Sequence, residues 1–218
     1  MGVVAKQTFY NLLSIGLAFF LGAVNTLYMY PNFMGSRFQG VVIALLAYSN
    51  LVQPFISFGL QHAIIKYYSS FNNKKERDSL LIFSIWSPLL ILSLIFFYLY
   101  FFSTSLVSNI SSKEPLLSTY AFVIILIAIS TSYFEIFYSW LRVQLVSVFG
   151  NFLKEFYPRL LSFLLLTLYA LDYINFEIFI YSLIIGYYLR LIFIIIYSLI
   201  VYSPEITFKL PTSYLKII

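Results

Sequence analysis

The sequence predicts an all-α membrane protein, a bundle of six transmembrane helices. Three observations lead there: the apolar composition, six long apolar runs, and an uneven distribution of cations among the connections. The 218-residue chain is 61% hydrophobic and only 10% charged, whereas a soluble domain of this length needs far more charge to cover its surface. Aromatic residues reach 21%, which suits lipid-facing surfaces and the aromatic belts at membrane interfaces.

Six apolar runs are the candidate membrane spans, since about 20 helical residues cross a hydrocarbon core roughly 30 Å thick. The predicted spans cover residues 8–30, 40–65, 80–102, 116–141, 156–171 and 176–202. The fifth run is short unless Asn151 to Glu155 already form its first turn. Pro54 and Pro88 predict bends in the second and third spans. The Ser-rich segment 103–115 is expected to be a connection, and residues 203–218 a cytoplasmic connector.

The cations predict the orientation of the bundle. Four of them lie in the short loop from Lys66 to Arg77, and a loop of this kind stays in the cytoplasm. With six alternating spans, ten of the 13 Lys and Arg residues fall on the cytoplasmic side. Only Arg37 and Lys113 fall on the opposite side, and Arg190 lies within the membrane. This bias predicts a multi-pass protein with both ends in the cytoplasm.

The composition argues against several function classes. The chain has no Cys and a single His, so neither a disulfide framework nor a metal site is expected, and no cofactor. No phosphate-binding or dinucleotide-binding glycine motif is present. The net charge of +5 resides mainly in loops, where it is expected to meet anionic lipid headgroups rather than nucleic acid. We therefore expect a protein that is not an enzyme.

Two charges lie well inside predicted spans rather than near their ends. Placing an acidic residue such as Glu135 near mid-span costs about 2.5–3.5 kcal/mol, and Arg190 lies even farther from either interface. Thr131 shares a helix face with Glu135. We expect all three residues to line a substrate cavity, with Glu135 either pairing with Arg190 or titrating with a coupling ion. The alternative is a buried ion pair that only fixes the helix register.

Polar side chains recur at helical spacing on the first two spans. Such a face turns either toward neighbouring helices or toward a wet cavity. Asn11, Asn25 and Gln53 are the cavity candidates of these stripes, and Pro54 beside Gln53 is typical of a pocket in a membrane bundle. His62, near the cytoplasmic end of the second span, is either satisfied at the interface or part of a proton relay. The stripes consist of Gln7, Asn11, Ser14, Ala18, Gly22 and Asn25, and of Ser49, Gln53, Ser57 and Gln61.

The region from Met34 to Lys75 resembles the first-to-second helix region of bacterial polysaccharide flippases. These are the oligosaccharide-lipid exporters of the multidrug/oligosaccharidyl-lipid/polysaccharide superfamily. The resemblance covers about residues 1–80. It is carried by Gly40, by Phe58-Gly59-Leu60, by the exit Lys66-Tyr67-Tyr68-Ser69, and by Val4-Ala5-Lys6-Gln7 before the first helix.

The resemblance implies one half of a two-bundle transporter fold in the bacterial inner membrane. Two six-helix bundles would face each other across a cavity that takes a polyprenyl-diphosphate-linked oligosaccharide for cell-surface polysaccharide or lipopolysaccharide biosynthesis. This chain holds one bundle, and the tail 208–218 is expected to lead into a second, so a fragment is expected. The alternatives are a non-transporting membrane subunit or scaffold and a multidrug exporter of the same fold. Partners would be the lipid-linked oligosaccharide, the bilayer and the missing bundle.

Overall fold

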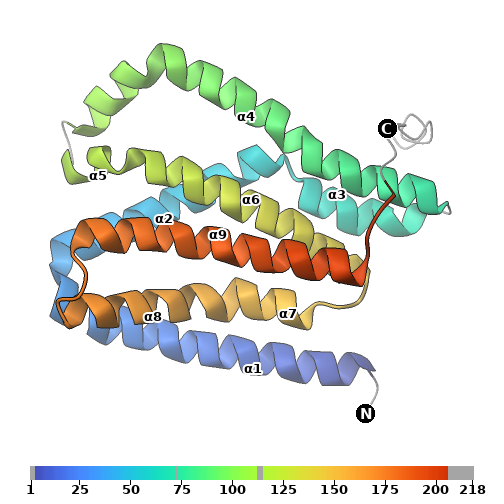
Figure 1. Ribbon diagram of the computed structural model, residues 1–218, viewed down its shortest axis with the longest axis horizontal. Coiled ribbons are helices and arrows are strands. Elements are labelled where there is room, and N and C mark those ends of the chain that lie inside the picture. Colours follow the sequence, from blue (N-terminus) through green and yellow to red (C-terminus); the bar gives the residue numbers. More distant parts are fainter. Residues whose placement is uncertain (1–2, 72, 112–114, 206–218) are drawn as a thin grey trace.

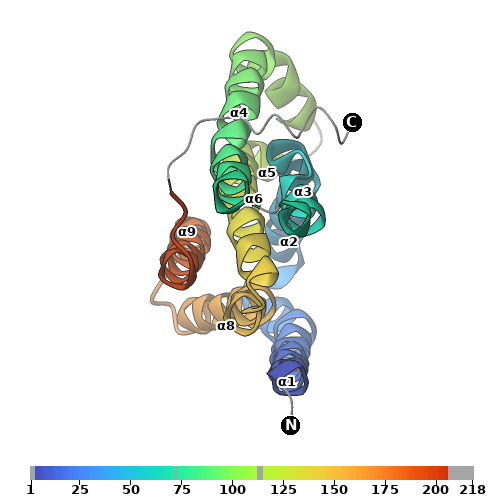
Figure 2. The same ribbon diagram turned by 90° about the vertical axis from the view of Figure 1, so that its right-hand side faces the viewer.

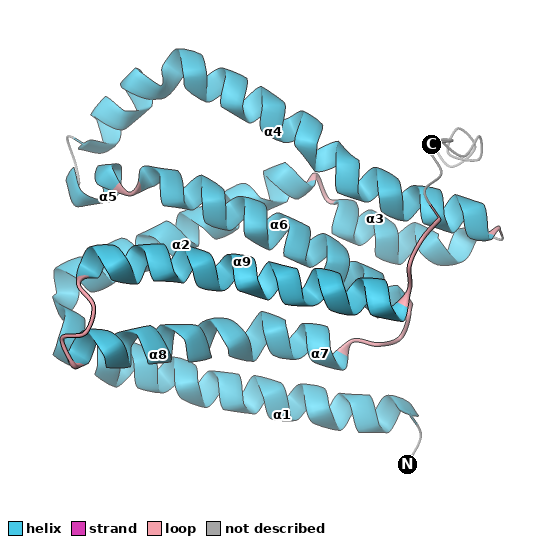
Figure 3. Cartoon of the chain, in the orientation of Figure 1, coloured by secondary structure: helices cyan, strands magenta, loops and turns pink. Residues whose placement is uncertain are grey.

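The computed structural model describes residues 3–71, 73–111 and 115–205, and this part of the chain is helical without a strand (Figures 1 and 3). The predicted all-α class is therefore confirmed. In chain order the elements are α1 (Val3–Val24), the π-helix η1 (Asn25–Met34), α2 (Gly35–Ser57), α3 (Leu60–Tyr67), the short 3₁₀ turn η2 (Tyr68–Ser70), α4 (Lys74–Ser111), α5 (Pro115–Thr119), α6 (Ala121–Val143), α7 (Val148–Asn151), the π-helix η3 (Phe152–Phe156), α8 (Tyr157–Ala170) and α9 (Phe176–Val201).

Four helical stretches are long and apolar enough to cross a membrane. They are Ala5–Ser57, Lys74–Tyr98, Ala121–Val143 and Phe176–Val201. The first stretch contains α1, η1 and α2, and Figure 1 shows α1 and α2 running in opposite directions from a shared end. The backbone turns there at Gly35, whose φ of 77° suits a residue without a Cβ. These helices indicate a membrane protein, and the count of six spans stays a prediction.

The predicted second span is two helices rather than one. Its residues belong to α2 and α3, which are separated at Phe58 and Gly59, with φ of 47° and 71°. Both angles are left-handed, a conformation that ends a helix and that glycine adopts most readily. Pro54 lies inside α2, and the helix ends at Ser57.

Most of the segment 103–115, which was expected to be a connection, is helical. Helix α4 continues through it as far as Ser111. No Gly or Pro interrupts residues 103–111, and a helical serine can bond back to the preceding turn. Ser84 does this earlier in α4, where its hydroxyl donates to the Leu80 carbonyl at 2.8 Å. Polarity alone was therefore a poor signal for the end of this helix.

The fifth and sixth predicted spans are joined by a tight turn, as expected. Helical backbone begins at Val148 and continues through η3 and α8 to Ala170, so Asn151 to Glu155 are helical and lengthen the fifth run. Asp172 then adopts a positive φ of 58°. The Asn175 side chain caps α9 by accepting from the Ile178 backbone N–H at 2.8 Å.

Hydrogen bonds gather four segments at one end of the bundle. The Gln7 side chain of α1 donates to the Leu145 carbonyl at 2.7 Å, and the Gln144 side chain donates to the Tyr68 hydroxyl at 2.7 Å. At the start of α4, Lys74 pairs with Glu205 beyond α9 at 2.8 Å. These are the segments whose cations predict the cytoplasmic side.

Aromatic contacts gather the other connections at the opposite end. The Phe176 ring at the start of α9 lies 4.4 Å from the Phe38 ring and 5.7 Å from the Tyr120 ring, centre to centre. The structure therefore separates the two groups of connections in the way that the cation pattern predicts.

Helix α6 is the centre of the packing. Figure 2 shows it between α9 on one side and α2 with α3 on the other, while α8 and α1 lie below, and α6 contacts α2, α3 and α9. Its Ile127, Phe134, Trp140 and Leu141 are buried. Helix α1 lies at the edge of the bundle and exposes large apolar side chains, as expected for a surface that meets lipid or another protein.

Candidate functional site

Arg190 and Thr131 are the two candidate residues that the structure brings into contact. Arg190 is only 4% exposed, and its Nη2 donates to the Thr131 hydroxyl at 3.3 Å. The guanidinium carbon lies 4.3 Å from the centre of the Phe134 ring and 4.6 Å from that of Tyr187. Arg190 Nε is buried and has no hydrogen-bond partner among the described residues. The cation is thus held between two aromatic rings inside the bundle.

Glu135 pairs with Lys154 of η3 rather than with Arg190. Lys154 Nζ lies 2.7 Å from Glu135 Oε1. Consecutive helical residues point about 100° apart. Since Phe134 faces Arg190, the next residue is turned away, toward η3. The expected pairing of Glu135 with Arg190 is therefore not the one that the structure contains.

Asn11 of α1 and Asn25 of η1 lie where these elements pack against the α7–α8 run. The Asn25 side chain donates to the Arg159 carbonyl at 2.8 Å, and the Asn11 side chain donates to the Ser147 hydroxyl at 3.4 Å. Ala18, between them on the same stripe, is buried. Of the two interpretations of this stripe, helix packing describes these contacts.

Gln53 and His62 lie apart from the other candidates. The Gln53 carbonyl accepts from the Ser132 hydroxyl at 3.0 Å, which joins α2 to α6, and its side chain donates to Ser57 at 3.2 Å. His62 is exposed on α3. Neither residue contacts Arg190, Thr131 or Glu135 in the hydrogen bonds and ion pairs of the described chain.

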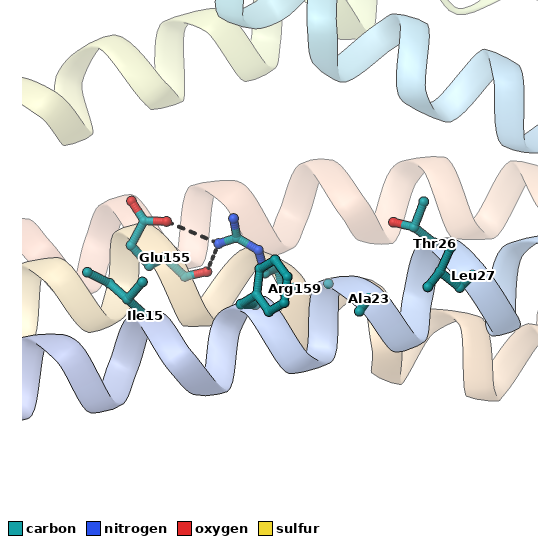
Figure 4. Close-up of a pocket in the computed structure, with 8 residues that line it drawn as sticks. Ile15, Ala23, Thr26, Leu27, Glu155 and Arg159 are labelled. Atoms are coloured by element: carbon teal, nitrogen blue, oxygen red, sulfur yellow. Dashed lines mark hydrogen bonds and ion pairs between the residues drawn. The ribbon is translucent and has the colours of Figure 1, made fainter.

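A groove of about 440 Å³ lies between α1 and α8. Figure 4 shows Arg159 in it, beside Glu155 and facing α1. Arg159 Nη1 lies 3.2 Å from Glu155 Oε2 and also donates to the Glu155 carbonyl. The two side chains are 40% and 31% exposed. The groove is lined by Ile15, Phe19, Gly22, Ala23, Thr26, Leu27, Glu155 and Arg159.

Gly22 allows Arg159 to lie against α1. A Cβ added at Gly22 would stand 3.2 Å from Arg159 Nε, closer than an ordinary contact. Arg159 also lies near the middle of the helical run Val148–Ala170. A half-exposed charge pair at mid-helix is costly against hydrocarbon chains, so such residues usually face water, another protein or a polar partner.

Sequence reasoning missed this groove because it placed Lys154, Glu155 and Arg159 at the junction between a cytoplasmic connection and the fifth predicted span. The signal was present in the spacing: Glu155 and Arg159 are four residues apart, the separation at which helical side chains meet. A π-helix, such as η3 here, is frequent at functional sites, but nothing in composition reveals one.

The described residues contain no cluster of three His, Asp or Glu side chains that could hold a metal ion. Comparison with models of protein families, with curated proteins and with solved structures finds no match for this chain. A function is therefore inferred from the geometry of the groove and from the arrangement of the helices.

Proposed function

We propose that the chain is part of a bacterial inner-membrane flippase for polyprenyl-diphosphate-linked oligosaccharides, working by alternating access. The observation that carries the proposal is the half-exposed Glu155–Arg159 pair at the middle of a helical run. Ionisable residues at this depth usually mark the path of a polar substrate. The groove side of α1 and α8 would then face the transport cavity.

Six spans with both ends in the cytoplasm belong to the same proposal. They would be α1 with η1, α2 with α3, α4, α6, α7 with α8, and α9. A second bundle would cover the groove side across the cavity. The contacts that gather the cation-rich connections at one end support this arrangement.

A membrane scaffold is the second candidate. Its support is that Asn11, Asn25 and Gln53 make helix-packing hydrogen bonds. A multidrug exporter of the same fold would share the groove but would not depend on a glycan. A measurement of glycan export distinguishes these two alternatives from the flippase.

The experiment uses the complete reading frame that encodes this chain, in a bacterium lacking its own flippase. Restored display of the surface glycan is expected. This chain has no Cys, and any Cys in the rest of the reading frame is first replaced by Ser, so that a bulky, water-soluble thiol reagent leaves export by the parent protein unchanged. Phe19→Cys, in the groove, should become sensitive to the reagent. Phe20→Cys, its neighbour outside the groove, should not.

The pair is matched, because both phenylalanines lie on α1 and are 78% and 65% exposed. No glycan display from a well-expressed protein would refute the flippase. Export with equal sensitivity of the two cysteine variants would refute the groove as part of the path.

A further inference from the structure

The α1–α8 groove presents charges of both signs to whatever occupies it. Arg159 uses Nη1 to bind Glu155. Arg159 Nε and Nη2 make no hydrogen bond within the part of the chain that the structure describes, and neither does Glu155 Oε1. The groove therefore has guanidinium donors and a carboxylate acceptor available side by side.

Neighbouring charges do not neutralise Glu155. Lys154, the adjacent cation in sequence, has its ammonium 2.7 Å from Glu135 and is bound there. Arg190 is enclosed between Phe134 and Tyr187. The ion pair that Glu155 makes within the described chain is with Arg159, so a purely anionic ligand on Arg159 would meet the Glu155 carboxylate at close range.

Apart from Thr26, the rest of the groove is apolar. Ile15, Phe19 and Leu27 of α1 and η1 line it, and all three are exposed. Gly22 and Ala23 lie between them, and their small size leaves room in the groove. A hydrocarbon chain lying there would bury this surface, at about 25 cal/mol for each Å² removed from water.

We propose that the groove binds a zwitterionic phospholipid with a primary ammonium, of the phosphatidylethanolamine type. Phosphate oxygens accept from Arg159 Nε and Nη2, since a guanidinium fork matches phosphate geometry. The ammonium donates to Glu155, and an acyl chain lies along Phe19 and Leu27. This inference does not depend on the flippase proposal, because it concerns binding by the folded chain alone.

Lipid binding is measured on the purified full chain in a neutral detergent, as the rise in melting temperature on titration with lipids of identical acyl chains. The series is phosphatidylethanolamine, phosphatidylcholine, phosphatidylglycerol and diacylglycerol. Phosphatidylethanolamine should bind most tightly, and diacylglycerol should give no saturable shift. Tighter binding of phosphatidylglycerol, or equal binding of diacylglycerol, would overturn the proposal.

Variants then test the two contacts. Arg159→Gln should weaken phosphatidylethanolamine binding about tenfold or more, the loss expected for a charged hydrogen bond. Glu155→Gln should abolish the preference for ethanolamine over choline headgroups. Arg37→Gln, an exposed cation outside the groove, should bind as the natural chain does. Unchanged binding by Arg159→Gln would refute the site.

A folding defect is separated from a binding defect by two features. Asn25 bonds to the backbone carbonyl of Arg159, so Arg159→Gln keeps that link between η1 and α8. Gly22→Leu leaves every charge in place and fills the groove next to Arg159. It should also abolish the lipid-dependent shift, and retained binding in a folded Gly22→Leu protein would contradict the proposed location.

Discussion

Lys154 Nζ lies 2.7 Å from Glu135 Oε1, and this ion pair ties the π-helix η3 to α6. Glu135 is 18% exposed and Lys154 39%, so water screens the pair only in part. The link holds the segment that carries Glu155 and Arg159 against the centre of the bundle.

Removing either partner of this pair should destabilise the protein. Glu135→Gln and Lys154→Gln should each lower the free energy of unfolding by about 1–2 kcal/mol, less than for a fully buried pair because Lys154 is partly solvated. In the double variant the losses should not add, since the second change removes a partner already lost. Denaturant unfolding in detergent measures the cycle, and additive losses would show that the pair is not coupled.

Even a conservative substitution of Arg190 should destabilise the protein. In Arg190→Lys a compact ammonium replaces the flat guanidinium between Phe134 and Tyr187, and we expect a loss of about 1–2 kcal/mol. The matched control is Arg142→Lys, an exposed cation 5.8 Å from the Tyr138 ring, which should change stability by about 0.5 kcal/mol or less. Equal effects of the two substitutions in thermal unfolding would show that the rings around Arg190 contribute nothing specific.

Adding one methyl group at Gly150 should destabilise the protein. A Cβ there would overlap the Tyr138 ring, and a ring held by Arg142 and Lys154 cannot move aside freely. Gly150→Ala should therefore cost about 1–3 kcal/mol through overpacking. Gly16→Ala, with nothing within 4 Å of the new methyl group, should be neutral or stabilising by up to about 1 kcal/mol. A Gly150→Ala protein as stable as the Gly16→Ala protein would contradict this packing.

The stability contributed by the segment after α9 should decrease in alkaline solution. The Tyr202 hydroxyl donates to the buried Asp78 carboxylate, and partial burial together with this bond raises the pKa of Tyr202 above its usual value of 10. A raised folded-state pKa contributes stability that is complete below pH 10 and is lost as pH rises through the raised value.

The measurement compares the natural chain with Tyr202→Phe. The difference in melting temperature should be largest at neutral pH and should close in strongly alkaline solution. At the same place, Lys74 lowers the pKa of Glu205 below 4.5, so that contribution is lost only in acid. A difference independent of pH between pH 7 and 12 would show that the Tyr202 proton is not involved.

Much of the architecture follows from the sequence, because apolar length and breakers are local signals. The last helix, expected over 176–202, is α9 at Phe176–Val201, and the turn at 172–175 is where Asp172 and Asn175 predict it. The cation-rich connections do lie at one end. The predicted end of α4 was wrong, since serine is tolerated in a helix that no Gly or Pro interrupts.

The site was harder to predict, because it depends on which helix faces meet. Arg190 and Thr131 come together as expected, but the orientation of Glu135 depends on one step of about 100° around α6. Arg159 was missed because Lys154, Glu155 and Arg159, three charges within six residues, are typical of a loop. Its place in the groove requires Gly22 on a helix far away in sequence, a contact that a single sequence does not reveal.

We expect the cation-rich connections to lie on one side of the membrane and the other turns on the opposite side. The natural chain has no Cys, so single cysteines can report each side with a membrane-impermeant thiol reagent. Ser36, Lys75, Leu145 and Tyr173 are all exposed. We predict that Ser36→Cys and Tyr173→Cys react in intact cells, and that Lys75→Cys and Leu145→Cys react only after permeabilisation. Labelling of Lys75→Cys and Leu145→Cys from opposite sides, or of all four positions from one side, would contradict the account.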